Sequence, residues 1–64
     1  MTTISDREAE VLALVRQGKA NKVIAHELGV SIHTIKSHVS SIMRKLGASN
    51  RTEVAVKAIS LGVA

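Results

Sequence analysis

The sequence predicts an all-α fold of four helices from three observations. Gly18, Gly29, Gly47 and Gly62 are evenly spaced in a chain of 64 residues that has no proline, as expected of residues that separate helices. Residues that favour helix N-termini precede the segments between these glycines. No stretch alternates apolar and polar residues for long enough to predict a strand. We therefore expect one small domain over residues 1–64, with an aliphatic core because aromatic residues are absent.

The first two helices have recognisable ends. Ser5 and Glu8 form a capping-box pattern at the start of the first helix, and Gly18 is placed to end it. Its apolar residues are Val11, Leu12, Leu14 and Val15. The second helix is predicted over about residues 21–28, with Asn21 as its N-cap.

Gly29, Val30 and Ser31 join the second helix to the third. A three-residue turn with glycine suits a helix-turn-helix, because the residue that leaves the first helix adopts a left-handed conformation. Ala25, one helical turn before Gly29, is small enough to let the two helices approach closely. The apolar contacts between them are expected from Ile24, Leu28, Val30 and Ile35. An ordinary αα-hairpin uses the same pattern, so spacing alone leaves both motifs open.

The third helix, predicted to run from its N-cap Ser31 to about Leu46, has two unlike sides. An arc of about 100° is apolar and carries Ile32, Ile35, Val39, Ile42, Met43 and Leu46. The opposite side carries bases and small hydroxyls, namely His33, Lys36, Ser37, Ser40, Ser41 and Arg44. A face exposed only to solvent would normally mix Glu with Lys and use better helix formers than serine. A solvated serine face is the alternative, but the composition favours a surface that a ligand approaches closely.

Positive charge is concentrated around this helix. The formal net charge is +4, and residues 28–52 hold no Asp or Glu but contain Lys36, Arg44, Lys45 and Arg51. The bases and acids outside this window cancel. A localised positive field indicates a polyanionic partner, and double-stranded DNA fits because a helix can enter its major groove. The absence of aromatic residues argues against binding of single strands by base stacking.

Phosphate contacts are expected at two places. The N-termini of the second and third helices present N–H groups and positive dipole ends to anions. A second basic cluster follows at the far end of the third helix. The expected phosphate-binding residues are Asn21, Lys22, Ser31, His33, Thr34, Arg44, Lys45, Asn50 and Arg51.

The fourth helix is introduced by Asn50, three residues before Glu53, and is predicted to end near Leu61. Its apolar residues cover about 220° of the helical wheel, more than one core-facing stripe needs. They are Val54, Ala55, Val56, Ala58, Ile59 and Leu61. The surplus predicts a dimerisation helix, with Val54, Ala58 and Leu61 as the interface because they share one side. A homodimer would match two-fold symmetric half-sites on DNA, whereas the alternative is incomplete amphipathicity at a frayed C-terminus.

Four stretches in this order resemble the LuxR-type DNA-binding domain, the effector domain of the NarL/FixJ class of bacterial regulators. They are SDREAEVL (5–12), GKANKVIA (18–25), VSIHTIKSHV (30–39) and RKLGASNRTE (44–53). The resemblance covers nearly the whole chain and implies four helices, with the third recognising DNA and the fourth dimerising on it. One departure is Ile4-Ser5, where the family usually has Leu-Thr; it keeps the apolar residue and the cap.

The resemblance also implies roles for single residues. By position, the base readers are Lys36, Ser37 and Ser40, and phosphate contacts include Lys22, Thr34, Lys45 and Arg51. A lysine can donate to guanine O6 or N7, and a serine can donate to or accept from a base edge. Positions 37 and 40 vary widely in the family, so the target sequence does not transfer.

These observations predict sequence-specific binding of double-stranded DNA by insertion of helix 32–46 into the major groove. The protein would be a bacterial transcription regulator or its excised effector domain, of the two-component response-regulator kind, with RNA polymerase as a further candidate partner. The alternative is a small protein-interaction module, an antiactivator or a sigma-factor-like fragment, that pairs through the fourth helix. We expect a cytoplasmic protein without a membrane partner, since the apolar runs are too short to span a bilayer. We expect no receiver domain before the first helix, because only a few residues precede it in this sequence.

An enzyme is not expected. The candidate general bases are His26, His33 and His38, and no Asp or Glu lies near the last two in sequence. His33 and His38 are five residues apart, so they point about 140° away from each other on one helix and cannot share a metal. The chain has no cysteine. We therefore expect no catalytic residue, no metal site and no cofactor.

Overall fold

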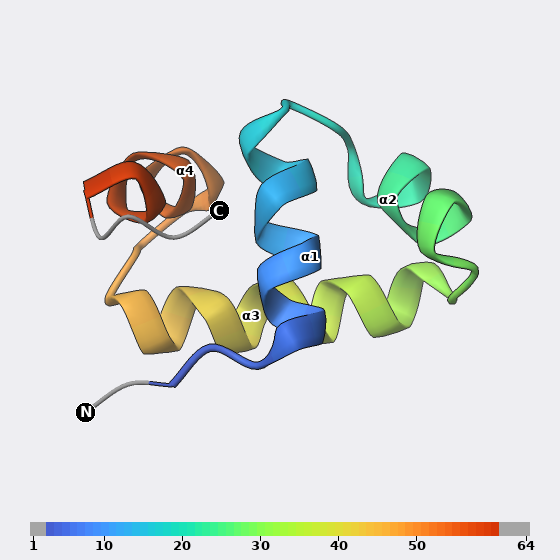
Figure 1. Ribbon diagram of the computed structural model, residues 1–64, viewed down its shortest axis with the longest axis horizontal. Helices are drawn as coiled ribbons and strands as arrows, with labels where there is room; N and C mark the ends of the chain where they lie inside the picture. The colour runs from blue at the N-terminus through green and yellow to red at the C-terminus, as the bar shows by residue number, and fades with distance from the viewer. Residues whose placement is uncertain (1–2, 61–64) are drawn as a thin grey trace.

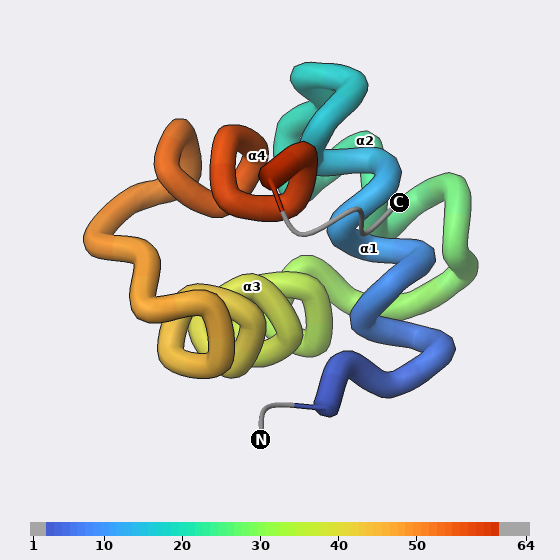
Figure 2. The backbone as a smooth tube through the Cα atoms, turned by 60° about the vertical axis from the view of Figure 1, so that its left-hand side comes forward, coloured from blue at the N-terminus to red at the C-terminus, as the bar shows by residue number. Residues whose placement is uncertain are grey.

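Four helices follow one another along the chain, as predicted: α1 (Asp6–Arg16), α2 (Asn21–Leu28), α3 (Ile32–Leu46) and α4 (Arg51–Ser60). The computed structural model describes residues 3–60, and within that range no residue belongs to a strand. α3 runs along one edge of the domain, α4 and α2 lie above its two ends, and α1 crosses it near its middle (Figure 1). Figure 2, turned from that view, shows α4 above α3 and α1 beside it. No helix in the described part of the chain is long and apolar enough to cross a membrane.

Side-chain caps start three of these helices. The acceptors are Ser5 Oγ, Ser31 Oγ and Asn50 Oδ1, which take the backbone N–H groups of Glu8, Thr34 and Glu53 at 3.1, 3.0 and 2.9 Å. The predicted capping box of α1 is confirmed. The prediction that Asn21 caps α2 is wrong, because the N-cap is Ala20 and Asn21 is the first residue of the helix. The Asn21 side chain is used in a tertiary contact instead.

The connection between α2 and α3 is the predicted helix-turn-helix turn. Gly29 adopts a left-handed conformation with φ of 68°, which a residue with a Cβ atom would adopt only at a cost. The Val30 N–H donates to the Ala25 carbonyl oxygen at 3.0 Å and closes the turn. Ala25 itself is buried in the core, and α2 and α3 pack against each other.

One side of α3 forms the centre of the core. Ile35 and Ile42 are fully buried and Val39 is nearly so. The helix packs against each of the other three helices. The predicted stripe is wrong at its first residue, because Ile32 is 40% exposed. Met43 and Leu46 are half-buried and pack against the core as expected.

The side of α4 that was predicted to form a dimer interface is buried in the core of the domain. Val54 and Ala58 are fully buried inside the domain, so neither can form a surface for a second copy. The prediction of these two interface residues is wrong because the apolar arc of α4 is broad. A helical wheel does not show which part of such an arc faces the core. The exposed apolar residues of α4 are Val56 and Ile59, at 60% and 64%. Leu61 lies outside the described residues.

Glu8 links α1 to α3 from a buried position. Its carboxylate accepts from Lys45 Nζ at 2.6 Å and from Ser41 Oγ at 2.7 Å, besides the backbone N–H of Ser5 at 3.0 Å. The hydrogen bond from Lys45, followed by that from Ser5, outweighs the opposing effect of burial and lowers the pKa of Glu8 from 4.5 to about 2. The buried carboxylate therefore stays charged and holds the two helices together.

Replacing this carboxylate should destabilise the domain. We expect Glu8→Ala to lower the free energy of unfolding by about 2 kcal/mol, because charge-assisted hydrogen bonds are lost and their donors are left unpaired. Glu10→Ala is the matched control: its carboxylate is exposed and lies 3.6 Å from Arg7, a pair of little energetic value. Urea unfolding at neutral pH measures both, and equal losses would contradict the role given to Glu8.

The pKa of Glu8 sets the direction of its pH dependence. Because folding lowers that pKa, the carboxylate stabilises the fold fully above about pH 4.5, and its contribution disappears as the pH falls toward 2. The same unfolding series, run from pH 7 to pH 2, should show this loss in the wild type and a smaller one in Glu8→Gln. Parallel curves for the two proteins would contradict the account.

Candidate nucleic-acid interface

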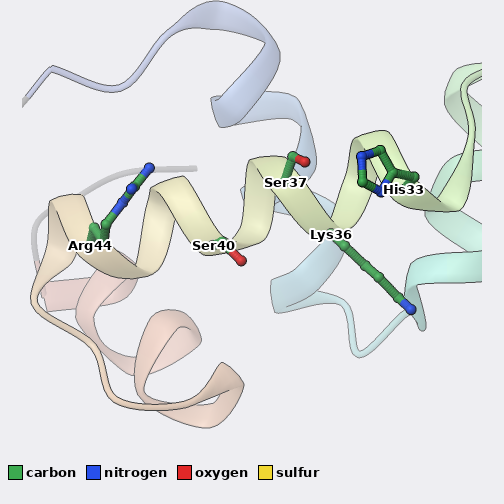
Figure 3. A pocket seen from close by; sticks show the side chains of 5 residues that line it. All are labelled: His33, Lys36, Ser37, Ser40 and Arg44. Atoms are coloured by element: carbon green, nitrogen blue, oxygen red, sulfur yellow. The ribbon is translucent and has the colours of Figure 1, made fainter.

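The side of α3 that turns away from the core carries a shallow, open groove. Five side chains line it: His33, Lys36, Ser37, Ser40 and Arg44. All five are exposed. In Figure 3 they follow one another along the helix, with Lys36 and Ser40 extending toward one edge and Ser37 and Arg44 toward the other. We call this set the outer face of α3.

The outer face contains all three predicted base readers and two of the predicted phosphate contacts. Its spacing follows the helix, since residues three and four apart share a side. The structure corrects the expected membership at Ser41. That side chain is half-buried and donates to Glu8, so it belongs to the link between α1 and α3. The neighbouring His38 is also half-buried, at the border of the core.

The outer face can make two kinds of contact. Lys36 and Arg44 supply positive charge near its two ends, and Ser37 and Ser40 supply short hydroxyls between them. No acidic side chain lines the groove. A helix face with long cations and short polar groups can donate hydrogen bonds to a polyanion while the helix backbone comes close.

Further predicted phosphate contacts lie at the N-termini of α2 and α3. Lys22 is exposed in the first turn of α2. At the start of α3, Ser31 Oγ accepts from the Thr34 N–H and also shares a hydrogen bond of 3.0 Å with Thr34 Oγ1. Ser31 Oγ therefore caps the helix, and the Thr34 hydroxyl is hydrogen-bonded to it. Asn50 is exposed and its side chain caps α4.

Three predicted phosphate contacts, Lys45, Arg51 and Asn21, have partners in other parts of the fold. The ammonium of Lys45 forms the ion pair with buried Glu8 at 2.6 Å. The half-buried guanidinium of Arg51 donates to Asn21 Oδ1 at 2.5 Å and to the carbonyl oxygen of Lys19. The structure thus assigns Lys45, Arg51 and the Asn21 amide to contacts that join helices. The sequence could not show this, because the partners are 30 to 37 residues apart.

Two lysines outside the interface also have intramolecular partners. Lys19 Nζ pairs with both carboxylate oxygens of Glu27 at 2.8 Å, and Lys57 Nζ donates to the Gly47 carbonyl oxygen at 2.8 Å. Sequence reasoning missed these contacts and the Glu8 link. No spacing rule connects residues across helices, and only the fold brings them together.

Comparison with known proteins identifies the family. Residues 2–58 match the family described as bacterial regulatory proteins, luxR family. The chain belongs to this family. It is 45% identical over 56 residues to the transcriptional regulatory protein LiaR of Bacillus subtilis, covering 88% of this chain and 26% of LiaR. It is 39% identical over 59 residues to the spore germination protein GerE of Bacillus subtilis, covering 92% of this chain and 80% of GerE.

A solved structure shows the same fold. The response regulator ChrA of a heme-sensing two-component system matches with a TM-score of 0.92 and 35% identity, over 97% of this chain and 31% of ChrA. The chain thus spans under a third of LiaR and ChrA and most of GerE. Membership of the luxR family supports a role in DNA-binding transcription regulation.

Arg44 and Lys45 are adjacent cationic residues with different surroundings, so replacing them should have different effects. We expect Arg44→Ala to reduce the slope of log affinity against log salt by about 0.9, the value of one phosphate contact, with little change in stability. Lys45→Ala should instead lower the free energy of unfolding, because it leaves Glu8 buried without its ammonium partner. Binding to a nonspecific duplex and urea unfolding measure the two effects. Indistinguishable variants would contradict this assignment.

Proposed function

We propose that this domain binds double-stranded DNA sequence-specifically by inserting α3 into the major groove. The observation that carries the proposal is the outer face of α3, a cationic and hydroxyl-rich surface on a helix whose other side is fixed in the core. An α-helix with its side chains is about 10–12 Å across, and the major groove is about 12 Å wide.

The residues in the middle of the outer face would contact the base edges. Lys36 can donate to guanine O6 and N7, whereas the hydroxyls of Ser37 and Ser40 can serve as donor or acceptor. These serines are short, so they let the α3 backbone lie close to the base edges. Specific contacts of this kind discriminate by about 1–3 kcal/mol each.

Phosphate contacts would surround the base readers. Lys22 carries exposed charge in the first turn of α2 and Arg44 in the last turn of α3. His33, Thr34, Ser31 and Asn50 offer polar groups at helix ends. Such contacts fix the register of the protein on the duplex without reading sequence. Their number sets the salt dependence, since each neutralised phosphate releases counterions.

A homodimer on two half-sites would use the exposed apolar residues of α4. Val56 and Ile59 are three residues apart, share one side of the helix and are largely exposed. This pair replaces the interface expected from the sequence. A two-fold pair of domains presents two copies of α3 to symmetric DNA half-sites.

In the whole protein, the domain would serve as the output of a regulator. LiaR and ChrA are a transcriptional regulatory protein and a response regulator, and both are longer than this chain. We infer a role in transcription control of the two-component kind, in the cytoplasm, with RNA polymerase as a candidate partner at the promoter.

The first test is DNA affinity across a salt series, in the wild type and in Lys36→Ala. Log affinity for duplex DNA should fall linearly with log salt, as phosphate binding requires. On the preferred sequence, obtained by selection from random duplexes, Lys36→Ala should lose about 1–3 kcal/mol of binding free energy and discriminate less at one base pair. Its unfolding curve should match the wild type, because Lys36 is exposed.

A flat salt response, or no binding at low salt, would overturn the proposal. It would favour the protein-interaction module that pairs through α4. Equal losses by Lys36→Ala on preferred and random duplexes would retain DNA binding but remove Lys36 from base reading.

The homodimer is tested with Val56→Ser and Ile59→Ser. On a duplex that carries two symmetric half-sites we expect each variant to bind at least about tenfold more weakly, because linked binding at the second half-site is lost. Binding to a single half-site should not change. Ser60→Ala, also on exposed α4 surface, is the control. Unchanged affinity of both variants for the paired half-sites would exclude this surface from the dimer.

A further inference from the structure

Arg51 forms a bridge between the first residue of α4 and the beginning of α2. Its Nη1 donates to Asn21 Oδ1 at 2.5 Å, and its Nη2 donates to the carbonyl oxygen of Lys19. The planar guanidinium therefore holds two acceptors on one rigid fork. Both acceptors are neutral, so these contacts leave the positive charge of Arg51 in place.

α2 needs such a contact because nothing in its own sequence fixes its start. Its N-cap is Ala20, which makes no side-chain hydrogen bond, whereas side chains cap the other three helices. α2 has eight residues, and isolated helices shorter than about 12–15 residues are marginal in water. Its position at the N-terminal end therefore depends on tertiary contacts, and Arg51 supplies a bidentate one.

The residue next to this contact is Lys22, an exposed cation in the first turn of α2. Fixing Asn21 also fixes where the Lys22 side chain leaves the helix relative to the outer face of α3. We propose that Arg51 is a positioning residue: it places the start of α2, and with it Lys22, for phosphate contact, and does not itself bind phosphate. The inference rests on the proposed DNA binding and deepens it.

The two roles of Arg51 predict opposite results for Arg51→Lys. A lysine keeps the charge and could still contact a phosphate, but it lacks the fork that holds two acceptors. If Arg51 positions α2, Arg51→Lys should reduce the salt slope on a nonspecific duplex by about 0.9, as Lys22→Ala does, and lower affinity about tenfold. The double variant Lys22→Ala, Arg51→Lys should then have the slope of either single variant.

Asn21→Ala provides a second variant that leaves every charge in place. On the positioning account it also reduces the slope by about 0.9, because it removes one arm of the bridge. If Arg51 were a phosphate ligand, releasing it from a neutral amide would leave the slope unchanged or steeper. Circular dichroism first establishes that each variant is folded. If Arg51→Lys does not fold, the salt slope of Asn21→Ala distinguishes the two roles of Arg51.

The inference is overturned if Arg51→Lys and Asn21→Ala keep the wild-type slope, or if the double variant differs from Arg51→Lys by a further full phosphate contact. In those cases DNA binding by the wild type stands and only the role of Arg51 fails. If the wild type does not bind the duplex at low salt, the proposed function fails and the inference with it.

Discussion

The burial of one side of α3 is the constraint on which the rest of the domain depends. Ile35 and Ile42 have no exposed surface, and each contributes about 1.5–3 kcal/mol of transfer free energy. α1, α2 and α4 all pack on that side, so the opposite side of the same helix remains in solvent (Figure 1). A rigid helix with one face fixed and one face open suits insertion into a groove, because its exposed side chains start from a defined position.

Polar contacts between helices determine which basic residues are left to carry positive charge on the outer face of α3. Lys45 forms an ion pair with Glu8, and Arg51 donates hydrogen bonds to neutral oxygens at the start of α2. Positive charge on the outer face of α3 then comes from Lys36 and Arg44. The chain thus uses some of its cations to orient helices and others to present charge. A count of basic residues in the sequence does not separate these two uses.

The helices themselves were predictable because their signals are local. Capping residues, left-handed glycines and the periodicity of α3 are signals between residues close in the chain. They predicted the helix bounds except at the N-cap of α2, which is Ala20. The end predicted for the fourth helix near Leu61 lies outside the described residues. The outer face was predictable for the same reason. The failures involve distant residues: Asn21 and Arg51 meet across the fold, and Ser41 turns toward Glu8. On α4, an apolar arc wider than a core stripe could not show that Val54 and Ala58 face inward while Val56 and Ile59 face outward.

The central claim, that the outer face of α3 contacts duplex DNA, is tested most directly by NMR chemical shifts of the backbone amides during titration with a duplex. The account predicts that the largest changes fall on His33, Lys36, Ser37, Ser40 and Arg44 and in the first turn of α2, with small changes on the exposed side of α1. Changes confined to α4 or α1, with α3 unaffected, would contradict it.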